Sequence, residues 1–585
     1  YIIVQKPTLF RRIKSIFSLE KRRNLLFVFE KMGFIEKIIF FTFAFLLTAS
    51  ALLLLKKASD GLSVEVPVLG GTLNEGVVGY PRYVNPLLPV TDSGRDLTTL
   101  VFSGLMKLDG ENGLVTDLAK DYKVSDDGLT YTVTLKDNIF FQDDVPVTAY
   151  DVEFTIKKAT DPIIKSPKAA NWEGVGVQVI DAKTIQFTLK KPYAPFIENL
   201  TLGILPMHIW KDIDSDAFLF SQFNFEPIGS GPYKIKDIKR NASGLPQYYH
   251  LTPFEKYAGG EAYIEDIYVW FYTNEDKLIE AYKSGVIDSM NSISPDNVKS
   301  VDTGRSEILK SPLPRIYGVF FNQNEAKVFA DSDVRQALYL ATPEDSIIKD
   351  VLLGFGTPIE GPIPKDISTL PAKEVTDEEG LEKAETLLAK SGWVKDANGI
   401  LAKKTKTDNL SLSFSIATSN VPELKAIAGL LKDSWGKLGA NVEVKVFDSG
   451  DLQQTVIVPR KYDALLFGES IGRNADLYAF WHSSERNHPG LNIANYTNSK
   501  VDKILQDIRT TSDREKRIAL YQSFEKEIYK DNPAVFLYSP DLVYIVPNDL
   551  KGISLQGIAG SSERFATVNK WYKETEKVWR MPWFN

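Results

Sequence analysis

An uncharged apolar run at residues 38–55, IIFFTFAFLLTASALLLL, is the feature that most limits how this chain can fold. Its 18 residues approach the length that a helix needs to cross the hydrocarbon core of a bilayer. Residues 1–57 carry eleven Lys or Arg and three Glu, and basic residues ahead of a span favour the cytoplasmic side. The sequence therefore predicts a single-pass protein of the cell membrane, whose parts are a basic cytoplasmic tail at 1–37, one transmembrane helix at 38–55, a tether at 56–70 and an extracytoplasmic body, at the cell surface or in the periplasm.

A cleaved secretory signal is the alternative interpretation of the same run. Ala49-Ser50-Ala51 resembles the small-residue site that signal peptidases prefer. Four leucines follow this site, and a mature chain would not be expected to begin with an exposed leucine run. An uncleaved anchor is therefore favoured, and under either interpretation the body is exported.

The composition excludes several classes of function. The 585 residues are too many for one compact core, so several domains are expected. The chain has no cysteine, which excludes disulfides, thiolate metal sites and a lipid-modified cysteine as anchor. Residues 1–57 carry a net charge of +8 and the remaining 528 carry −15, within −7 for the whole chain. Because so acidic a body repels nucleic acid, no nucleic-acid partner is expected.

Two patterns of hydrophobic residues follow each other along the body. Alternating apolar residues in TYTVTL and TIQFTL, together with Asp-Gly pairs at 109–110 and 127–128, predict short antiparallel strands joined by tight turns. Later, LSLSFSIAT and NVEVKVF read as strands on either side of PELKAIAGLLKDSWGKLG, which has helical spacing, Pro422 at its start and Gly439 at its end. That order is a βαβ unit and predicts a parallel sheet.

The stretch RNADLYAFWHSSERNHPGLNIANY, residues 473–496, concentrates aromatic, amide, histidine and acidic residues. His482 and His488 with Glu485 and Asp476 could form a metal site, and with it a metal-dependent hydrolase. The favoured interpretation is that both histidines only donate hydrogen bonds in a loop. The chain has no H-E-x-x-H, no G-x-x-x-x-G-K-[ST] and no EF-hand loop, so no catalytic residue, metal or cofactor is expected.

Several segments, taken in order, resemble the family 5 extracellular solute-binding proteins, the peptide-type receptors of ABC importers. They include PRYVNPLLP, VSDDGLTYTVTLKDNIFFQDDVPVTAYDVEFTI, ILPMHIW, PIGSGPYKI, FFNQNEAKVFADSDVRQALYLAT, GTPIEGPIP and the stretch at 473–496. The resemblance extends from about Gly70 to about Gly552. It implies a two-lobed α/β fold like that of type II periplasmic binding proteins, with an extra inserted domain.

On that resemblance, lobe I consists of residues 71–110, 225–318 and 536–575, the inserted domain of 111–224, and lobe II of 319–535. The family closes its lobes over a solute and presents it to a membrane permease. The resemblance therefore implies a monomer that binds a peptide or another small solute, works with ABC permease subunits and performs no covalent chemistry. A sensor or sugar-binding receptor of the same fold remains an alternative, because fold alone does not fix function.

The resemblance also suggests ligand-binding residues. Many relatives have an acidic residue in the loop that reads Asn474-Ala475-Asp476 here, so Asp476 is the candidate to hold a peptide's terminal ammonium. The common Asp-Pro-Asp pattern is incomplete in this chain, which leaves a sugar or another solute open. Tyr478 and Trp481 are expected to supply apolar faces and His482 a hydrogen bond, and Trp172 and Asn322 are weaker additions.

Overall fold

The computed structural model describes residues 27, 30–88, 91–110, 113–301, 304–363, 365, 368–373, 375–405, 409–473 and 476–579. They fall into two units, one made of the two chain ends up to Val68 and from Thr575, and one, Leu69–Glu574, that we call the body. Most of the predicted cytoplasmic tail lies outside the described residues, as do Asn474 and Ala475.

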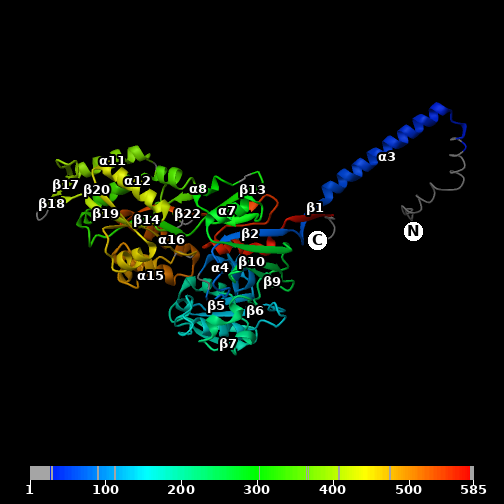
Figure 1. Ribbon diagram of the computed structural model, residues 1–585, viewed down its shortest axis with the longest axis horizontal. Coiled ribbons are helices and arrows are strands. Elements are labelled where there is room, and N and C mark those ends of the chain that lie inside the picture. Colours follow the sequence, from blue (N-terminus) through cyan, green and yellow to red (C-terminus); the bar gives the residue numbers. More distant parts are fainter. Residues whose placement is uncertain are drawn as a thin grey trace, which may run out of the picture. The chain divides into compact units, whose positions relative to one another are not determined.

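The unit made of the chain ends contains the long apolar helix. Helix α3, Phe34–Leu62, is blue in Figure 1. Within the described residues it is the one helix long and apolar enough to cross a membrane, over Phe34–Lys57, judged by length and composition. The predicted span lies inside it. The expected tether at 56–70 is more regular than predicted, because 56–62 continue the helix and β1, Ser63–Val68, pairs with β23, Glu574–Trp579.

One large mixed sheet runs through the body (Figure 1). Its strands are hydrogen-bonded in the order β20-β19-β21-β14-β22-β12-β2-β11-β10-β9, with β13 and β15 also paired to β22. In that order the bounds are Asn441–Phe447, Ser413–Ser419, Ala464–Ser470, Arg315–Phe321, Ala534–Pro547, Ser289–Asn291, Thr72–Val78, Asp266–Tyr272, Pro246–Pro253 and Tyr233–Arg240, then Ser306–Pro312 for β13 and Gly356–Pro358 for β15.

Strand β22 belongs to two halves of this sheet. Its first part pairs with β14, and its second part, from Asp541 onward, pairs with β13. The chain passes between the halves a second time at 313–314, and there the Leu313 amide donates to the Pro540 carbonyl at 2.9 Å. Proline carries no amide hydrogen for a ladder, and Pro312, Pro314 and Pro540 lie at these crossings. We call 313–314 and 539–540 the crossover segments, the side with β2 the first lobe and the side with β14 the second lobe.

Helices cover both faces of the second lobe's sheet. One buried cluster joins it to α9, α11 and α12, and another joins it to α14, α15 and α16. The first lobe packs against α4, α7 and the 3-10 segment η9. In the order named, the bounds are Ser332–Leu340, Asp377–Lys390, Pro422–Leu438, Tyr478–Trp481, Ser499–Thr510, Arg514–Asp531, Asp92–Val101, Glu275–Lys283 and Ser561–Lys570.

A separate antiparallel sheet, β5-β6-β8-β7, forms the region that we call the insert. The predicted alternation is confirmed, because Tyr131, Val133 and Leu135 of β6 are buried and the threonines between them are half-exposed. The bounds are β5 Ala119–Val124, β6 Thr130–Leu135, β8 Thr184–Thr188, β7 Gly176–Asp181, α5 Ala149–Ala159, η1 Ala169–Trp172, η2 Ala194–Thr201 and α6 Met207–Trp210.

The remaining elements are short. They are β3 Met106–Leu108, β4 Leu114–Thr116, η3 Phe218–Phe220, η4 Gln222–Asn224, α8 Pro295–Val298, η5 Lys327–Ala330, α10 Glu344–Ser346, η6 Ile347–Val351, β16 Val394–Lys395, β17 Leu401–Lys404, β18 Asn409–Ser411, α13 Ser449–Asp451, η7 Leu452–Ile457 and η8 Ser483–Glu485.

The predicted βαβ unit is also confirmed. Strands β19 and β20 are parallel neighbours joined by α12, which has Pro422 in its first turn. The helix ends at Gly439, whose φ of 108° is left-handed and favours glycine. Leu424, Ile427, Leu431 and Leu438 are all buried, as their helical spacing predicts.

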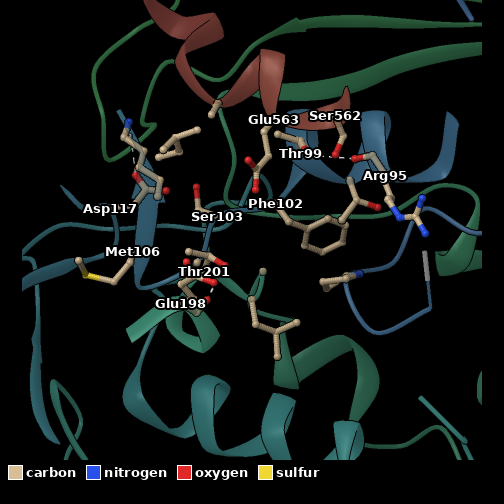
Figure 2. A pocket seen from close by; sticks show the side chains of 18 of the residues that line it. Arg95, Thr99, Phe102, Ser103, Met106, Asp117, Glu198, Thr201, Ser562 and Glu563 are labelled. Atoms are coloured by element: carbon tan, nitrogen blue, oxygen red, sulfur yellow. Dashed lines mark hydrogen bonds and ion pairs between the residues drawn. The ribbon is translucent and has the colours of Figure 1, made fainter. Parts of the chain in front are cut away.

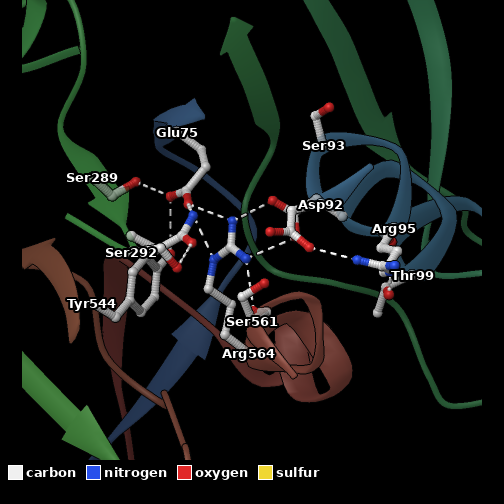
Figure 3. A network of polar contacts seen from close by, with 12 residues as sticks. Glu75, Asp92, Ser93, Arg95, Thr99, Ser289, Ser292, Tyr544, Ser561 and Arg564 are labelled. Atoms are coloured by element: carbon white, nitrogen blue, oxygen red, sulfur yellow. Dashed lines mark hydrogen bonds and ion pairs between the residues drawn. The ribbon is translucent and has the colours of Figure 1, made fainter. Parts of the chain in front are cut away.

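A fully buried ion-pair network holds the first lobe together (Figure 3). The Arg564 guanidinium of η9 lies 2.8 Å from Glu75 Oε1 of β2 and 2.7 Å from Asp96 Oδ2 of α4, and all three side chains are at most 1% exposed. Tyr544 of β22 donates to the other Glu75 oxygen at 3.0 Å. Burial raises the pKa of Asp96 in spite of this contact. The network therefore depends on Arg564 to compensate two buried acidic groups.

Replacing Arg564 by Met should lower the free energy of unfolding by about 3–5 kcal/mol, because two carboxylates would remain buried without a cation. Chemical denaturation of the full-length protein measures this change. The loss should shrink as the pH falls from about 8 to about 5, since burial already raises the pKa of Asp96 and protonation lets this carboxyl group stay buried without charge.

Lys299→Met is the matched control, because its ion pair with Asp296 is exposed on both sides. It should change stability by less than about 1 kcal/mol. An equally small effect of Arg564→Met would contradict the role given to the buried network.

Candidate functional site

Arg473 lines two of the cavities in the body, and the larger of these two lies at the crossover segments. Its volume is about 480 Å³. It is lined by Pro312–Ile316 of the crossing chain, by residues near 557 of the first lobe, and by Thr357, Ile359, Ile363 and Ile471 of the second. Because both lobes contribute to the wall, a change in the angle between them would change this cavity.

The smaller cavity has a volume of about 260 Å³. Helix α4 and the chain after it, η9 and the insert form its wall (Figure 2). Figure 2 shows Ser103, Glu198 and Glu563 pointing into this space, from the chain after α4, from η2 and from η9. Its wall mixes basic and acidic side chains, so a polar or charged group fits it better than a purely apolar one.

Arg473 connects the two cavities, since its side chain lines both. It lies just after β21 of the second lobe and reaches the first lobe, where it donates to the Gly557 carbonyl at 3.0 Å and pairs with Glu563 at 2.5 Å. Glu198 of the insert is 3.9 Å from the same guanidinium. One side chain of the second lobe thus contacts both the first lobe and the insert.

Asp476, the predicted ammonium ligand, already has strong partners. Arg509 of α15 donates to both its carboxylate oxygens, at 2.8 Å each, and the Tyr193 hydroxyl of the insert donates at 3.0 Å. Burial and the Asp476 carboxylate raise the pKa of Tyr193. In this conformation Asp476 joins the insert to the second lobe, and an ammonium group would have to compete with Arg509 for it.

Tyr478 and His482 lie near Asp476, and Arg509 contacts both Asp476 and Tyr478. The Tyr478 ring stacks on the His482 ring with centroids 4.0 Å apart, and the Arg509 guanidinium lies 3.9 Å from the centre of the Tyr478 ring. His482 Nδ1 accepts from the Ser484 amide at 3.1 Å, and its Nε2 is 3.1 Å from Gln506. The hydrogen-bonding capacity of His482 is therefore used within the second lobe.

The other three predicted residues lie elsewhere. Trp481 is 0% exposed, and its ring packs among Phe320, Tyr496, Phe524 and Phe536 in the core of the second lobe. Trp172 is buried in the insert against Phe187 and Phe196 but reaches the wall of the smaller cavity. Asn322 is 1% exposed and donates to the Arg460 carbonyl at 2.9 Å. Of the six, only Trp172 lines either cavity.

The basic residues of the cavities were not among the predicted residues. Arg473 opens the stretch at 473–496, and its position directly after a strand was the available signal. Lys168 and Arg95 carry no local pattern that points to a cavity, because distant segments bring them to the same wall.

Within the residues that the structure describes, nothing matches the geometry of the alternative metal-dependent hydrolase. In the described part of the chain, no group of three His, Asp or Glu residues is placed to hold a metal ion. The sequence GESIG at 468–472 matches the G-x-S-x-G pattern of serine hydrolases, which requires a strand, a sharp turn and a helix. Here β21 ends at Ser470, but the next helix, α14, begins only at Tyr478. Among the described residues, no histidine is hydrogen-bonded to Ser470.

The comparisons with known proteins agree with this geometry. A model of bacterial extracellular solute-binding proteins, family 5 Middle, matches residues 113–488. The oligopeptide-binding protein AppA of Bacillus subtilis is 29% identical over 506 residues, which cover 84% of this chain and 90% of that protein. The structure of AppA in complex with a nonapeptide has a TM-score of 0.65 and 27% identity, and the match covers 87% of this chain and 99% of that one. NikZ from Campylobacter jejuni in complex with Ni(L-His) has a TM-score of 0.66 and 28% identity, covering 86% of this chain and 99% of that one. The predicted α/β fold with one apolar N-terminal helix is thereby confirmed.

Trp481→Ala should lower the free energy of unfolding by about 3–5 kcal/mol, because it removes a large ring from a packed core. Thermal or chemical unfolding of the full-length protein measures this effect. Phe220→Ala is the control, since Phe220 is 84% exposed and its loss should change little. If Trp481→Ala is as stable as the wild type, the core position of Trp481 is contradicted and its predicted place in the cleft wall is favoured again.

Proposed function

Since the chain belongs to the bacterial extracellular solute-binding proteins of family 5, we propose that it is a membrane-anchored receptor that captures peptides between its lobes and delivers them to an ABC import permease. The observation that carries the proposal is the pair of cavities that share Arg473, one at the crossover segments and one between the first lobe and the insert. Peptides are favoured because AppA of Bacillus subtilis is an oligopeptide-binding protein and its structure contains a nonapeptide.

The crossover segments at 313–314 and 539–540 are the proposed hinge. They are close to the predicted lobe boundaries at 318–319 and 535–536, and we keep the predicted inserted domain at 111–224 as part of the proposal. Two short chain segments can absorb a change in backbone angle while the sheets on either side keep their pairing. The lobes would then move as rigid bodies about this line.

Contacts such as that of Arg473 with Glu563 would form on closure and break on opening. Ion pairs that remain partly exposed contribute about 1 kcal/mol or less. Arg473 and Glu563 are 18% and 31% exposed. Such contacts alone leave open and closed forms close in free energy, so a ligand that touches both lobes decides between them. Extended peptides suit such a site because their backbone groups bond to the protein main chain, whatever their side chains.

Helix α3 is the proposed anchor, with the body on the extracytoplasmic side and the basic residues before it in the cytoplasm. We further propose that the receptor works as a monomer and catalyses no reaction, as the relatives are binding proteins of transporters. Binding of a sugar, or of a nickel chelate of the kind in the NikZ structure, is the alternative within the same fold.

Mass spectrometry of small molecules that remain bound through native purification should find peptides. The full-length protein is purified in detergent, and bound material is released by denaturation. Arg473→Met should retain about fivefold to tenfold less, since it loses a charged contact between the lobes. Arg514→Met, an exposed position on α16, is the control. Sugars or a nickel–histidine complex in place of peptides would contradict the proposed cargo.

When the protein is expressed in bacteria, helix α3 should remain uncleaved and inserted in the membrane. The protein is expected to stay in the membrane pellet after alkaline carbonate washing, and its intact mass should include the apolar run at 38–55. Recovery of a soluble form that begins after Ala51 would show a cleaved signal and contradict the anchor.

A further inference from the structure

One basic side chain of the smaller cavity makes no direct ion pair in the described part of the chain. Lys168 lines this cavity at the start of η1, and its Nζ makes no hydrogen bond or ion pair with a described residue. Its position is fixed by the backbone, because its amide donates to Ser166 Oγ at 3.1 Å and this hydroxyl donates to the Leu87 carbonyl at 2.7 Å. The loop that carries Lys168 is thus held against the first lobe.

The other basic residues of this cavity are compensated. Lys107 lies 3.8 Å from Asp117, and Arg95 pairs with Asp92 on α4 at 2.6 Å. Arg473 pairs with Glu563. Among the described basic residues that line this cavity, Lys168 is therefore the one without a direct counter-ion.

The surroundings of Lys168 disfavour its charged form. Burial lowers the pKa of Lys168, the charge of Arg95 lowers it further, and Glu563 offsets part of this effect. An ammonium group removed from water without a partner is costly, and an anion placed beside it recovers much of that cost.

We propose that Lys168, with Arg95 nearby, forms a subsite for a carboxylate of the bound peptide, either its C-terminal carboxylate or an Asp or Glu side chain. This subsite rests on the proposed function. A cavity of about 260 Å³ is near the lower limit for ligand pockets and suits one end of a peptide. Glu198 and Glu563 also line this cavity, and they repel a carboxylate, with its one negative charge, less than they repel a phosphate dianion.

The test uses the full-length protein in detergent and a synthetic mixture of tri- to pentapeptides, made once with free C-terminal carboxylates and once as C-terminal amides. Retained peptides are identified by mass spectrometry. If Lys168 binds the C-terminal carboxylate, the wild type should retain at least about tenfold more of the free acids than of the amides. If Lys168 binds an acidic side chain instead, peptides that contain Asp or Glu should be enriched by a similar factor in both mixtures.

Lys168→Met should remove this enrichment, while Lys168→Arg should keep it and Lys157→Met, an exposed position on α5, should not affect it. The melting temperature of Lys168→Met should equal or exceed that of the wild type, because an uncompensated charge is removed. Equal retention of acidic, neutral and amidated peptides by the wild type, or persistent enrichment in Lys168→Met, would overturn the subsite and leave the proposed function standing. Retention of no peptide from either mixture would instead overturn the proposed function and the subsite with it.

Discussion

Strand β22 is the constraint on which the body depends, because it is hydrogen-bonded into both halves of the large sheet. A strand shared in this way keeps the two lobes adjacent, but its ladder changes partner at Pro540, where no amide hydrogen is available. The second crossing at 313–314 is bonded to the first at this point. The lobes are therefore firmly connected along one line and depend elsewhere on side-chain contacts.

Those side-chain contacts gather in the segment after β21. Arg473 reaches the first lobe and approaches the insert, and three residues later Asp476 binds the hydroxyl of Tyr193 in the insert. Both contacts involve groups that can also bind charged ligands. Because this segment contacts the first lobe and the insert, a ligand that binds to it can affect both of them. A receptor that closes around its cargo requires such a coupling.

Local patterns predicted the elements well. Alternation in TYTVTL and the spacing of leucines in α12 depend on neighbours within a few residues, and the structure confirms both. The pairing of Asp476 with Arg509, 33 residues away, and with Tyr193, 283 residues away, has no local signal. Trp481 was expected from the family resemblance to supply an apolar face to the ligand, yet its ring is surrounded by aromatic residues from distant segments. The roles of the predicted site residues thus depend on tertiary contacts that spacing alone cannot give.

Closure of the lobes around a ligand can be measured directly, because the chain has no cysteine of its own. Spin labels at Lys239→Cys in β9 and Lys432→Cys in α12 would mark the first and second lobes, and both positions are exposed. Double electron–electron resonance then gives the distribution of distances between the labels. The account predicts a shorter and narrower distribution once a peptide mixture is added. Superimposable distributions with peptide demonstrably bound would contradict it.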